Sequence, residues 1–174
     1  GLAVAVAFHG GLFNIGGEGQ AMLGGLGAGL VALAAPAWMP AALLLPLMVL
    51  AAMGFGAAWA AVPGALQAWR GSHVVITTIM FNFIASALLA YLLVNVMKAP
   101  GSMTVETAPF PESAHMPGMH QLLAALGIDW PRTPLNLSVL MAIAAALAVG
   151  VFLWRSRAGY ELRAVGHSPD AAHY

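Results

Sequence analysis

Long apolar runs alternate with short polar segments along most of the sequence. Val74–Met97 is the clearest run, with 24 residues and no charged side chain, and Leu135–Trp154 has 20 residues and no charge. Ala41–Val62 is a third uncharged run, interrupted by proline and glycine. A helix needs about 20 predominantly apolar residues to cross the hydrocarbon core of a membrane. Each run therefore predicts a membrane-spanning helix.

Two less regular apolar segments precede these runs. Glu18–Ala35 is rich in glycine and alanine and predicts a fourth span, in which pairs such as Gly25 and Gly29 favour close helix packing. Residues 1–8 are apolar from a first residue that is not methionine, so we expect the end of a truncated helix in a fragment of a longer protein. The predicted fold is an all-α polytopic transmembrane bundle, with about four full spans plus the truncated N-terminal one, in a single transmembrane domain.

The composition supports a membrane protein. Only 7% of the residues are charged and 61% are hydrophobic, whereas soluble domains carry about 25% charged residues. Six Lys and Arg balance six Asp and Glu, which gives no support for a nucleic-acid partner. Cysteine is absent from the sequence, so disulfides and thiolate metal sites are excluded.

Sequence patterns of catalysis are missing. The six histidines show no metal-ligand spacing, and the chain has no nucleophile elbow and no phosphate-binding loop. We therefore expect no catalytic residue, no metal and no cofactor, and any ATP that drives the protein must be bound by another chain. An intramembrane enzyme and a purely structural membrane subunit remain as alternatives.

Basic residues predict the orientation, because cytoplasmic segments carry an excess of Lys and Arg. If the runs span the membrane, four of the six basic residues fall on one side: Arg70, Arg155, Arg157 and Arg163. Lys98 and Arg132 fall on the other side. We expect residues 67–73 and 155–174 to be cytoplasmic. The proline-rich loop 98–134, with one short helix at Met119–Leu126, is then external.

The stretch FNIGGEGQ, residues 13–20, places several polar groups among apolar neighbours. One interpretation is that Glu18 caps a helix while Asn14 and Gln20 tie down a turn, since polar residues favour helix starts. The other is that the glycines loosen the backbone beside a polar pathway, as irregular backbone does where it lines a cavity. Both stay open at this point.

Two further segments carry polar groups. Thr78 and Asn82 are four residues apart and share a helix face, where they form an interhelical hydrogen bond or contact a polar solute. In the C-terminal segment, Tyr160–Val165 predicts a short helix with Gly166 as its stop. Ser168-Pro169-Asp170 then predicts a new helix start. The segment is either a docking element or an ordinary connection.

Three motifs, in this order and spacing, carry a resemblance: FNIGGEGQAMLGG, GSHVVITTIMFNFIASALLAYLL and GYELRAVGHSPDAAHY. Together they resemble the permease subunits of bacterial ABC importers of the branched-chain amino acid and simple-sugar type, and more narrowly the nucleoside branch. The resemblance implies a permease that dimerises in the inner membrane, ATP-binding cassette ATPase subunits docked beneath it, and an extracytoplasmic solute-binding lipoprotein. Its solute is then a nucleoside, with sugars or branched-chain amino acids as the alternative, moved by alternating access.

The resemblance also assigns roles to residues. Its first motif places Asn14, Gly16, Glu18, Gly19 and Gln20 near the translocation path, and we add Thr78 and Asn82 as pathway residues. Its last motif places a second set in the cytoplasmic region that couples to the ATPase: Arg163, Ala164, Gly166, Pro169 and Asp170. One departure is His9-Gly10-Gly11, which stands where family members often have Arg-Ala-Gly, so that a titratable group replaces a fixed charge.

Overall fold

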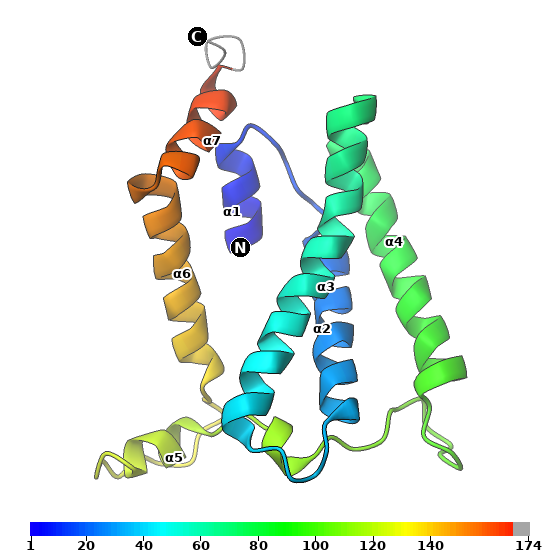
Figure 1. Cartoon of the computed structure of the whole chain (residues 1–174), viewed down its shortest axis with the longest axis vertical. Helices are drawn as coiled ribbons and strands as arrows, with labels where there is room; N and C mark the ends of the chain where they lie inside the picture. Colours follow the sequence, from blue (N-terminus) through cyan, green and yellow to red (C-terminus); the bar gives the residue numbers. More distant parts are fainter. Residues whose placement is uncertain (169–174) are drawn as a thin grey trace. The chain divides into compact units, whose positions relative to one another are not determined.

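The computed structural model describes residues 1–168, and these are helical apart from their connections (Figure 1). The residues that it describes contain an isolated bridge between Gly118 and Asn136 but no strand. The prediction of an all-α fold is therefore confirmed. The helices are α1 (Leu2–His9), α2 (Gly17–Ala34), α3 (Ala41–Arg70), α4 (Val74–Leu92) with the π-helical turn η1 (Leu93–Met97), the 3-10 turn η2 (Glu112–Ala114), α5 (Met119–Ala124), α6 (Ser138–Arg155) and α7 (Arg157–His167).

The chain forms two compact units. The α2–α4 unit comprises Phe13–His115, and the terminal unit comprises Gly1–Leu12 together with the chain from Met116 onward. Helices α2, α3 and α4 pack on one another in the first, and α1 packs on α6 and α7 in the second.

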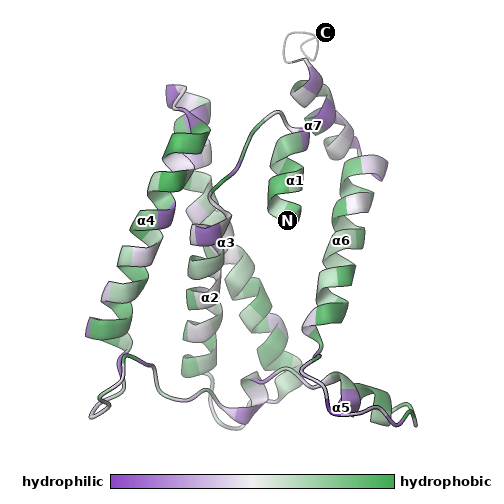
Figure 2. Cartoon of the chain, turned by 180° about the vertical axis from the view of Figure 1, so that it is seen from behind, coloured by the Kyte–Doolittle hydropathy of each residue, from purple (hydrophilic) through white to green (hydrophobic). Residues whose placement is uncertain are grey.

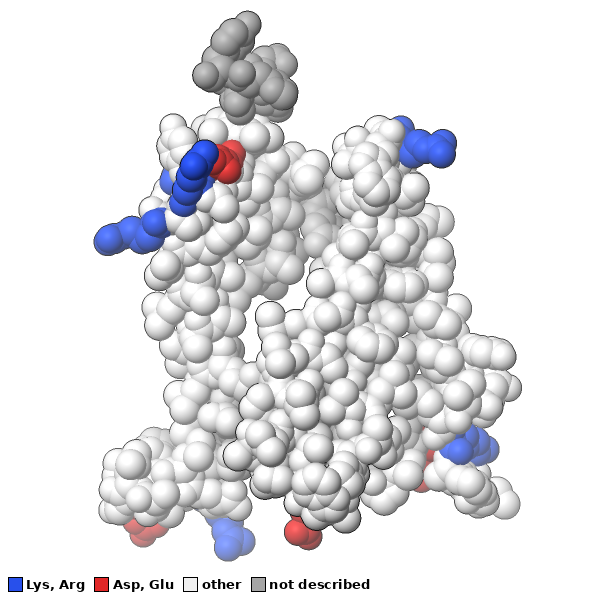
Figure 3. Space-filling model, in the orientation of Figure 1, with Lys and Arg blue, Asp and Glu red and all other residues white. Residues whose placement is uncertain are grey.

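Three helices within residues 1–168 are long and apolar enough to cross a membrane: Ala41–Arg70, Val74–Met97 and Ser138–Arg155. Figure 2 colours α3, α4 and α6 predominantly as hydrophobic. On the face drawn in Figure 3 the charged side chains form a few small groups, and most of the surface is uncharged. Large apolar side chains such as Leu50, Phe83 and Leu147 are exposed on these helices, as expected for surfaces that face lipid or further helices.

Helix α2 is the central element of the α2–α4 unit. It has 18 residues but is less apolar than those three, and it supplies both buried leucines of the core cluster, Leu23 and Leu26. Its backbone approaches α3 closely: a Cβ on Gly27 would lie 2.8 Å from the carbonyl oxygen of Ala51. The space beside Gly25 is open, so the predicted close packing at Gly25 is wrong, and the close approach occurs at Gly24 and Gly27 instead.

Helix α3 runs eight residues past the predicted span. Pro63 lies inside the helix and is buried, although proline normally interrupts a helix. The helix ends where Gly71 adopts a left-handed conformation (φ 63°) and its N–H donates to the carbonyl of Gln67.

Candidate translocation and coupling sites

The turn before α2 is closed by two amide side chains. Asn14 Oδ1 accepts a hydrogen bond from the backbone N–H of Gly16 at 2.8 Å. The amides of Asn14 and Gln20 also donate to each other, at 3.4 Å in both directions. These contacts match the interpretation in which Asn14 and Gln20 tie down a turn at the helix start. They leave both side chains half-buried beside the first turn of α2.

Asn82 bridges α4 to the start of α2. Its Oδ1 accepts from the backbone N–H of Gly19 at 2.9 Å, and its Nδ2 donates to the carbonyl oxygen of Ile15 at 3.0 Å. The first N–H groups of a helix have no partner within the helix. Asn82 therefore supplies from another helix the acceptor that the buried Gly19 needs, and the predicted interhelical hydrogen bond is confirmed.

Thr78 lies one turn earlier on the same face of α4 but does not point to open space. Its hydroxyl donates within its own helix, to the carbonyls of Val74 at 2.8 Å and Val75 at 3.1 Å. The side chain is 2% exposed, and a Cβ on Gly16 would lie 3.2 Å from that of Thr78. Among the residues predicted to lie near the path, Thr78 is buried together with Gly16 and Gly19, whereas Glu18 is exposed.

Glu18 is exposed in the first turn of α2, where the positive end of the helix dipole favours a carboxylate. Its side chain makes no cap hydrogen bond, which disagrees with its predicted role as a cap. Instead it lines a cavity of about 300 Å³. The other lining residues are Ile15, Ile79, Asn82, Phe83 and Ser86. A carboxylate, an amide and a hydroxyl thus face a small space whose remaining wall is apolar, as in sites for small neutral polar molecules.

Trp59 of α3 completes the surroundings of Gly19 and was not singled out from the sequence. A Cβ on Gly19 would lie 3.0 Å from Trp59 Nε1 and 3.0 Å from Asn82 Oδ1. The indole packs edge-on against Phe81 at 5.3 Å, and its buried N–H has no hydrogen-bond partner. The sequence gives little reason to select Trp59, because it lies within an apolar run and its one polar atom is the indole nitrogen.

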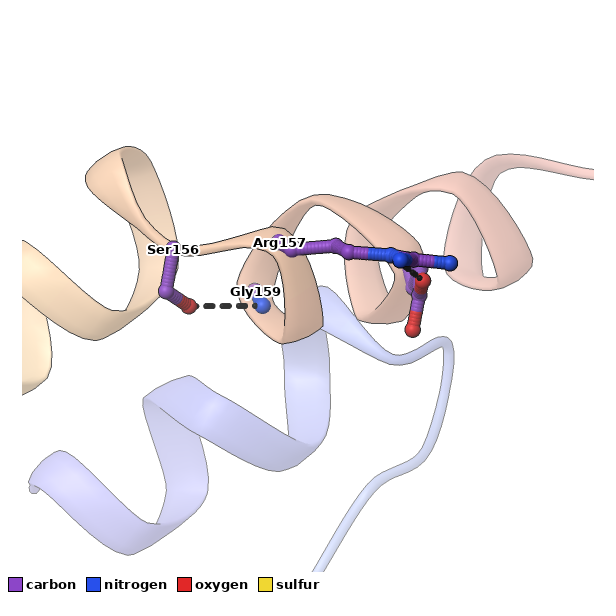
Figure 4. A network of polar contacts seen from close by, with 4 residues as sticks. Ser156, Arg157 and Gly159 are labelled. Atoms are coloured by element: carbon purple, nitrogen blue, oxygen red, sulfur yellow. Dashed lines mark hydrogen bonds and ion pairs between the residues drawn. The ribbon is translucent and has the colours of Figure 1, made fainter.

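The segment predicted to couple to an ATPase begins at the junction of α6 and α7 (Figure 4). Ser156 caps α7: its Oγ accepts from the N–H of Gly159 at 3.0 Å and donates to the carbonyl of Phe152 at 2.6 Å. Arg157 and Glu161 form an exposed ion pair of 2.8 Å on the first turn. An exposed pair of this kind contributes little to stability, on the order of 0–1 kcal/mol.

The prediction that Gly166 stops a helix at Val165 is wrong. Helix α7 extends from Arg157 to His167, and Gly166 lies inside it without a positive φ. Glycine is required there for a different reason, because a Cβ would overlap the carbonyl oxygen of His9. Pro169 and Asp170, predicted as a helix start and as coupling residues, lie outside the described residues.

Arg163 and Ala164 lie on the half-buried side of α7. The Arg163 guanidinium carbon lies 4.3 Å from the centroid of the Trp154 ring, and His9 meets the same ring edge-on at 5.9 Å. Arg163 thus reaches back toward α6. The described residues contain no group of three or more histidine or acidic side chains that would hold a metal ion.

Comparison with known proteins identifies relatives over the whole chain. The family model described as "Branched-chain amino acid transport system / permease component" matches residues 1–174. The guanosine ABC transporter permease protein NupP of Bacillus subtilis is 38% identical, over 100% of this chain and 47% of its own length. The glucose ABC transporter permease protein TsgB13 of Haloferax volcanii is 37% identical, over 99% of this chain and 45% of its own.

A third relative is the nucleoside ABC transporter permease protein NupB of Lactococcus lactis, 32% identical over 99% of this chain and 47% of its own. The chain therefore spans about half the length of the curated relatives that it matches. No solved structure matches.

Proposed function

Because this chain belongs to the permease family of branched-chain amino acid transport systems, we propose that it forms part of the membrane subunit of an ABC importer that carries nucleosides. The observation that carries the proposal is the similarity to a guanosine permease along the entire chain. A second nucleoside permease aligns over nearly the same residues.

The chemistry of the cavity beside α2 is compatible with such a solute. Glu18 offers a free acceptor for hydroxyl or amino groups, and the Ser86 hydroxyl both donates and accepts. The ring of Phe83 forms part of the apolar wall. A nucleoside combines a flat base with a hydroxyl-rich sugar and carries no net charge. The base suits the apolar wall with Phe83, and the sugar hydroxyls suit Glu18 and Ser86.

The proposed mechanism is alternating access. ATP binding and hydrolysis occur in separate ATPase subunits, and the permease makes and breaks no covalent bond. Their action displaces the coupling segment that contains Arg163, Ala164 and Gly166, and Asn14, Glu18, Gln20 and Asn82 then change their exposure to the two sides of the membrane. Thr78 contributes to the same path by packing beside Gly16.

We place the protein in the bacterial inner membrane with its C-terminal segment in the cytoplasm. The supporting observation is the excess of basic residues at the end of α3 and around α7, at Arg70, Arg155, Arg157 and Arg163. The proposed partners are the ATPase subunits, a second permease subunit and an extracytoplasmic solute-binding lipoprotein.

A sugar importer is the second candidate, because the glucose permease relative is almost as similar as the guanosine permease. Uptake of labelled nucleoside by cells with the intact permease, its ATPase and its binding protein distinguishes the two. Unlabelled nucleosides, ribose, glucose and leucine serve as competitors, and cells with an inactive ATPase are the control. We expect competition by nucleosides alone. Competition by glucose or ribose would move the solute to sugars, and the absence of energy-dependent uptake would refute the importer proposal.

A further inference from the structure

Helices α1 and α7 of the terminal unit touch through their backbones. A Cβ on Gly166 would overlap the His9 carbonyl oxygen and lie 2.9 Å from the N atom of Gly11. One turn earlier on α7, Leu162 covers Gly10, where a Cβ would lie 2.9 Å from Leu162 Cδ1. Residues four apart share a helix face, so one face of α7 lies against the end of α1 with no side chain separating the backbones at Gly166.

A tryptophan ties the same elements together. Trp154, near the end of α6, meets the His9 ring edge-on at an interplanar angle of 87°, and the Arg163 guanidinium stacks over it. One indole therefore contacts both α1 and α7. The Trp154 side chain is 60% exposed, so its cation–π contact with Arg163 is among the weaker contacts of this kind. The backbone contact at Gly166 therefore does most to hold α1 against α7.

The chain leaving α1 is held as far as Leu12. Gly11 adopts φ 74°, and the N–H groups of Gly11 and Leu12 donate to the carbonyls of Phe8 and Ala7 at 3.1 and 3.0 Å. Phe13, the next residue in the chain, begins the FNIGGEGQ stretch that contains Asn14 and Glu18. These two hydrogen bonds attach Gly11 and Leu12 to the last turn of α1, so the contact with α7 involves the whole end of that helix.

We propose that α1 and α7 move as one body during transport, so that a displacement of α7 carries α1 with it. Gly166 and Trp154 are then positioning residues: neither contacts the solute, and both keep α1 attached to α7. The inference rests on the proposed importer function, since it assumes that a partner moves α7. It adds α1 to the elements that α7 displaces, beside α6, to which α7 is directly connected.

The first test measures coupling in the reconstituted importer, with the full-length permease, its ATPase and its binding protein. Gly166→Ala inserts a methyl group between α1 and α7, and Gly150→Ala on α6 is the matched control because a Cβ there meets open space. We expect Gly166→Ala to lower solute uptake per ATP hydrolysed by about tenfold, as overpacking pushes the helices apart, and Gly150→Ala to leave the ratio unchanged. Equal ratios in the two variants would overturn the proposal.

A second test does not depend on Gly166→Ala assembling. These 174 residues contain no cysteine. In an importer whose other cysteines have been replaced, Gly10→Cys with Leu162→Cys gives a unique pair that a short thiol crosslinker can join. We expect the crosslinked importer to keep its uptake rate, because the joined elements do not separate during the cycle. Loss of uptake that returns when a reducible crosslink is cleaved would overturn the proposal. Single-cysteine variants with the same reagent are the control.

The two proposals fail separately. Both tests use whichever solute the unmodified importer accumulates, so a sugar instead of a nucleoside changes the substrate class without affecting the coupling ratio. A conservative variant adds a further check: Trp154→Phe keeps an aromatic ring beside Arg163 and should retain more coupling than Trp154→Leu. Equal coupling in both variants would remove Trp154 from the proposal.

Discussion

Replacing Asn82 by alanine removes both hydrogen bonds that join α4 to the start of α2. The N–H of Gly19 loses an acceptor at 2.9 Å and the carbonyl of Ile15 loses a donor at 3.0 Å. Gly19 is buried, whereas Ile15 is 37% exposed and its carbonyl can find another donor. The cost is therefore dominated by one buried unpaired N–H group.

The expected magnitude follows from two ranges. A buried polar group left without its partner costs about 1–3 kcal/mol, and interhelical hydrogen bonds in membranes contribute about 0.6 kcal/mol on average and up to about 1.7. We therefore expect Asn82→Ala to lower the free energy of unfolding by about 1–2 kcal/mol. Denaturant unfolding of the purified full-length permease in micelles, followed by tryptophan fluorescence, measures this change.

Asn95→Ala is the matched control. Asn95 belongs to the π-helical continuation of α4, and its Nδ2 donates within the helix to the carbonyl of Tyr91 at 3.0 Å on an exposed surface. This variant loses the same amide group without breaking a contact between helices, so we expect a change within about 0.5 kcal/mol. If Asn82→Ala and Asn95→Ala differ by less than about 0.5 kcal/mol, the bridge at Gly19 does not stabilise the helix start and the reasoning is refuted.

Three further predictions test other parts of the structure. Gly27→Ala should destabilise the permease by about 1–3 kcal/mol through overpacking against Ala51, whereas Gly25→Ala should be neutral in the same unfolding assay; equal effects would contradict the described α2–α3 contact. Glu18→Gln should reduce nucleoside uptake without reducing the amount of assembled complex in the membrane, and a parallel loss of both would indicate a structural role instead. Arg157→Ala should change stability by less than about 1 kcal/mol, because the ion pair with Glu161 is exposed; a larger loss would mean that this pair is shielded by a partner.

The sequence predicts the helices well because their signal is local. An uncharged run such as Val74–Met97 forms a helix over its whole length, with the last five residues in a π-helical turn. Proline and glycine were less informative. Pro63 does not end α3 although it lacks an N–H, and it lies buried inside the helix. Gly166 does not end α7, because its small size serves a contact with α1.

The sequence predicts the hydrogen-bond partners of the polar residues only in part. The shared face of Thr78 and Asn82 follows from their spacing, but the groups that Asn82 binds lie 63 and 67 residues away, and nothing in the local pattern specifies them. For the same reason the contact of Trp154 with both His9 and Arg163 was not anticipated. Contacts between distant segments depend on how the helices pack, which a single sequence does not show.

The length of α3 also relates the protein to the bilayer around it. Its 30 residues make a rod of about 45 Å at about 1.5 Å per residue, whereas the hydrocarbon core is about 30 Å thick. The apolar run Ala41–Val62 alone matches that thickness, so an upright α3 carries residues 63–70 into the headgroup layer. Trp69, 83% exposed, and Arg70 then lie where indole and guanidinium groups anchor helices. In a bilayer with longer lipid chains, hydrophobic mismatch would draw residues 63–70 toward the hydrocarbon core. We therefore expect the lipid chain length to affect the position of α3 in the membrane.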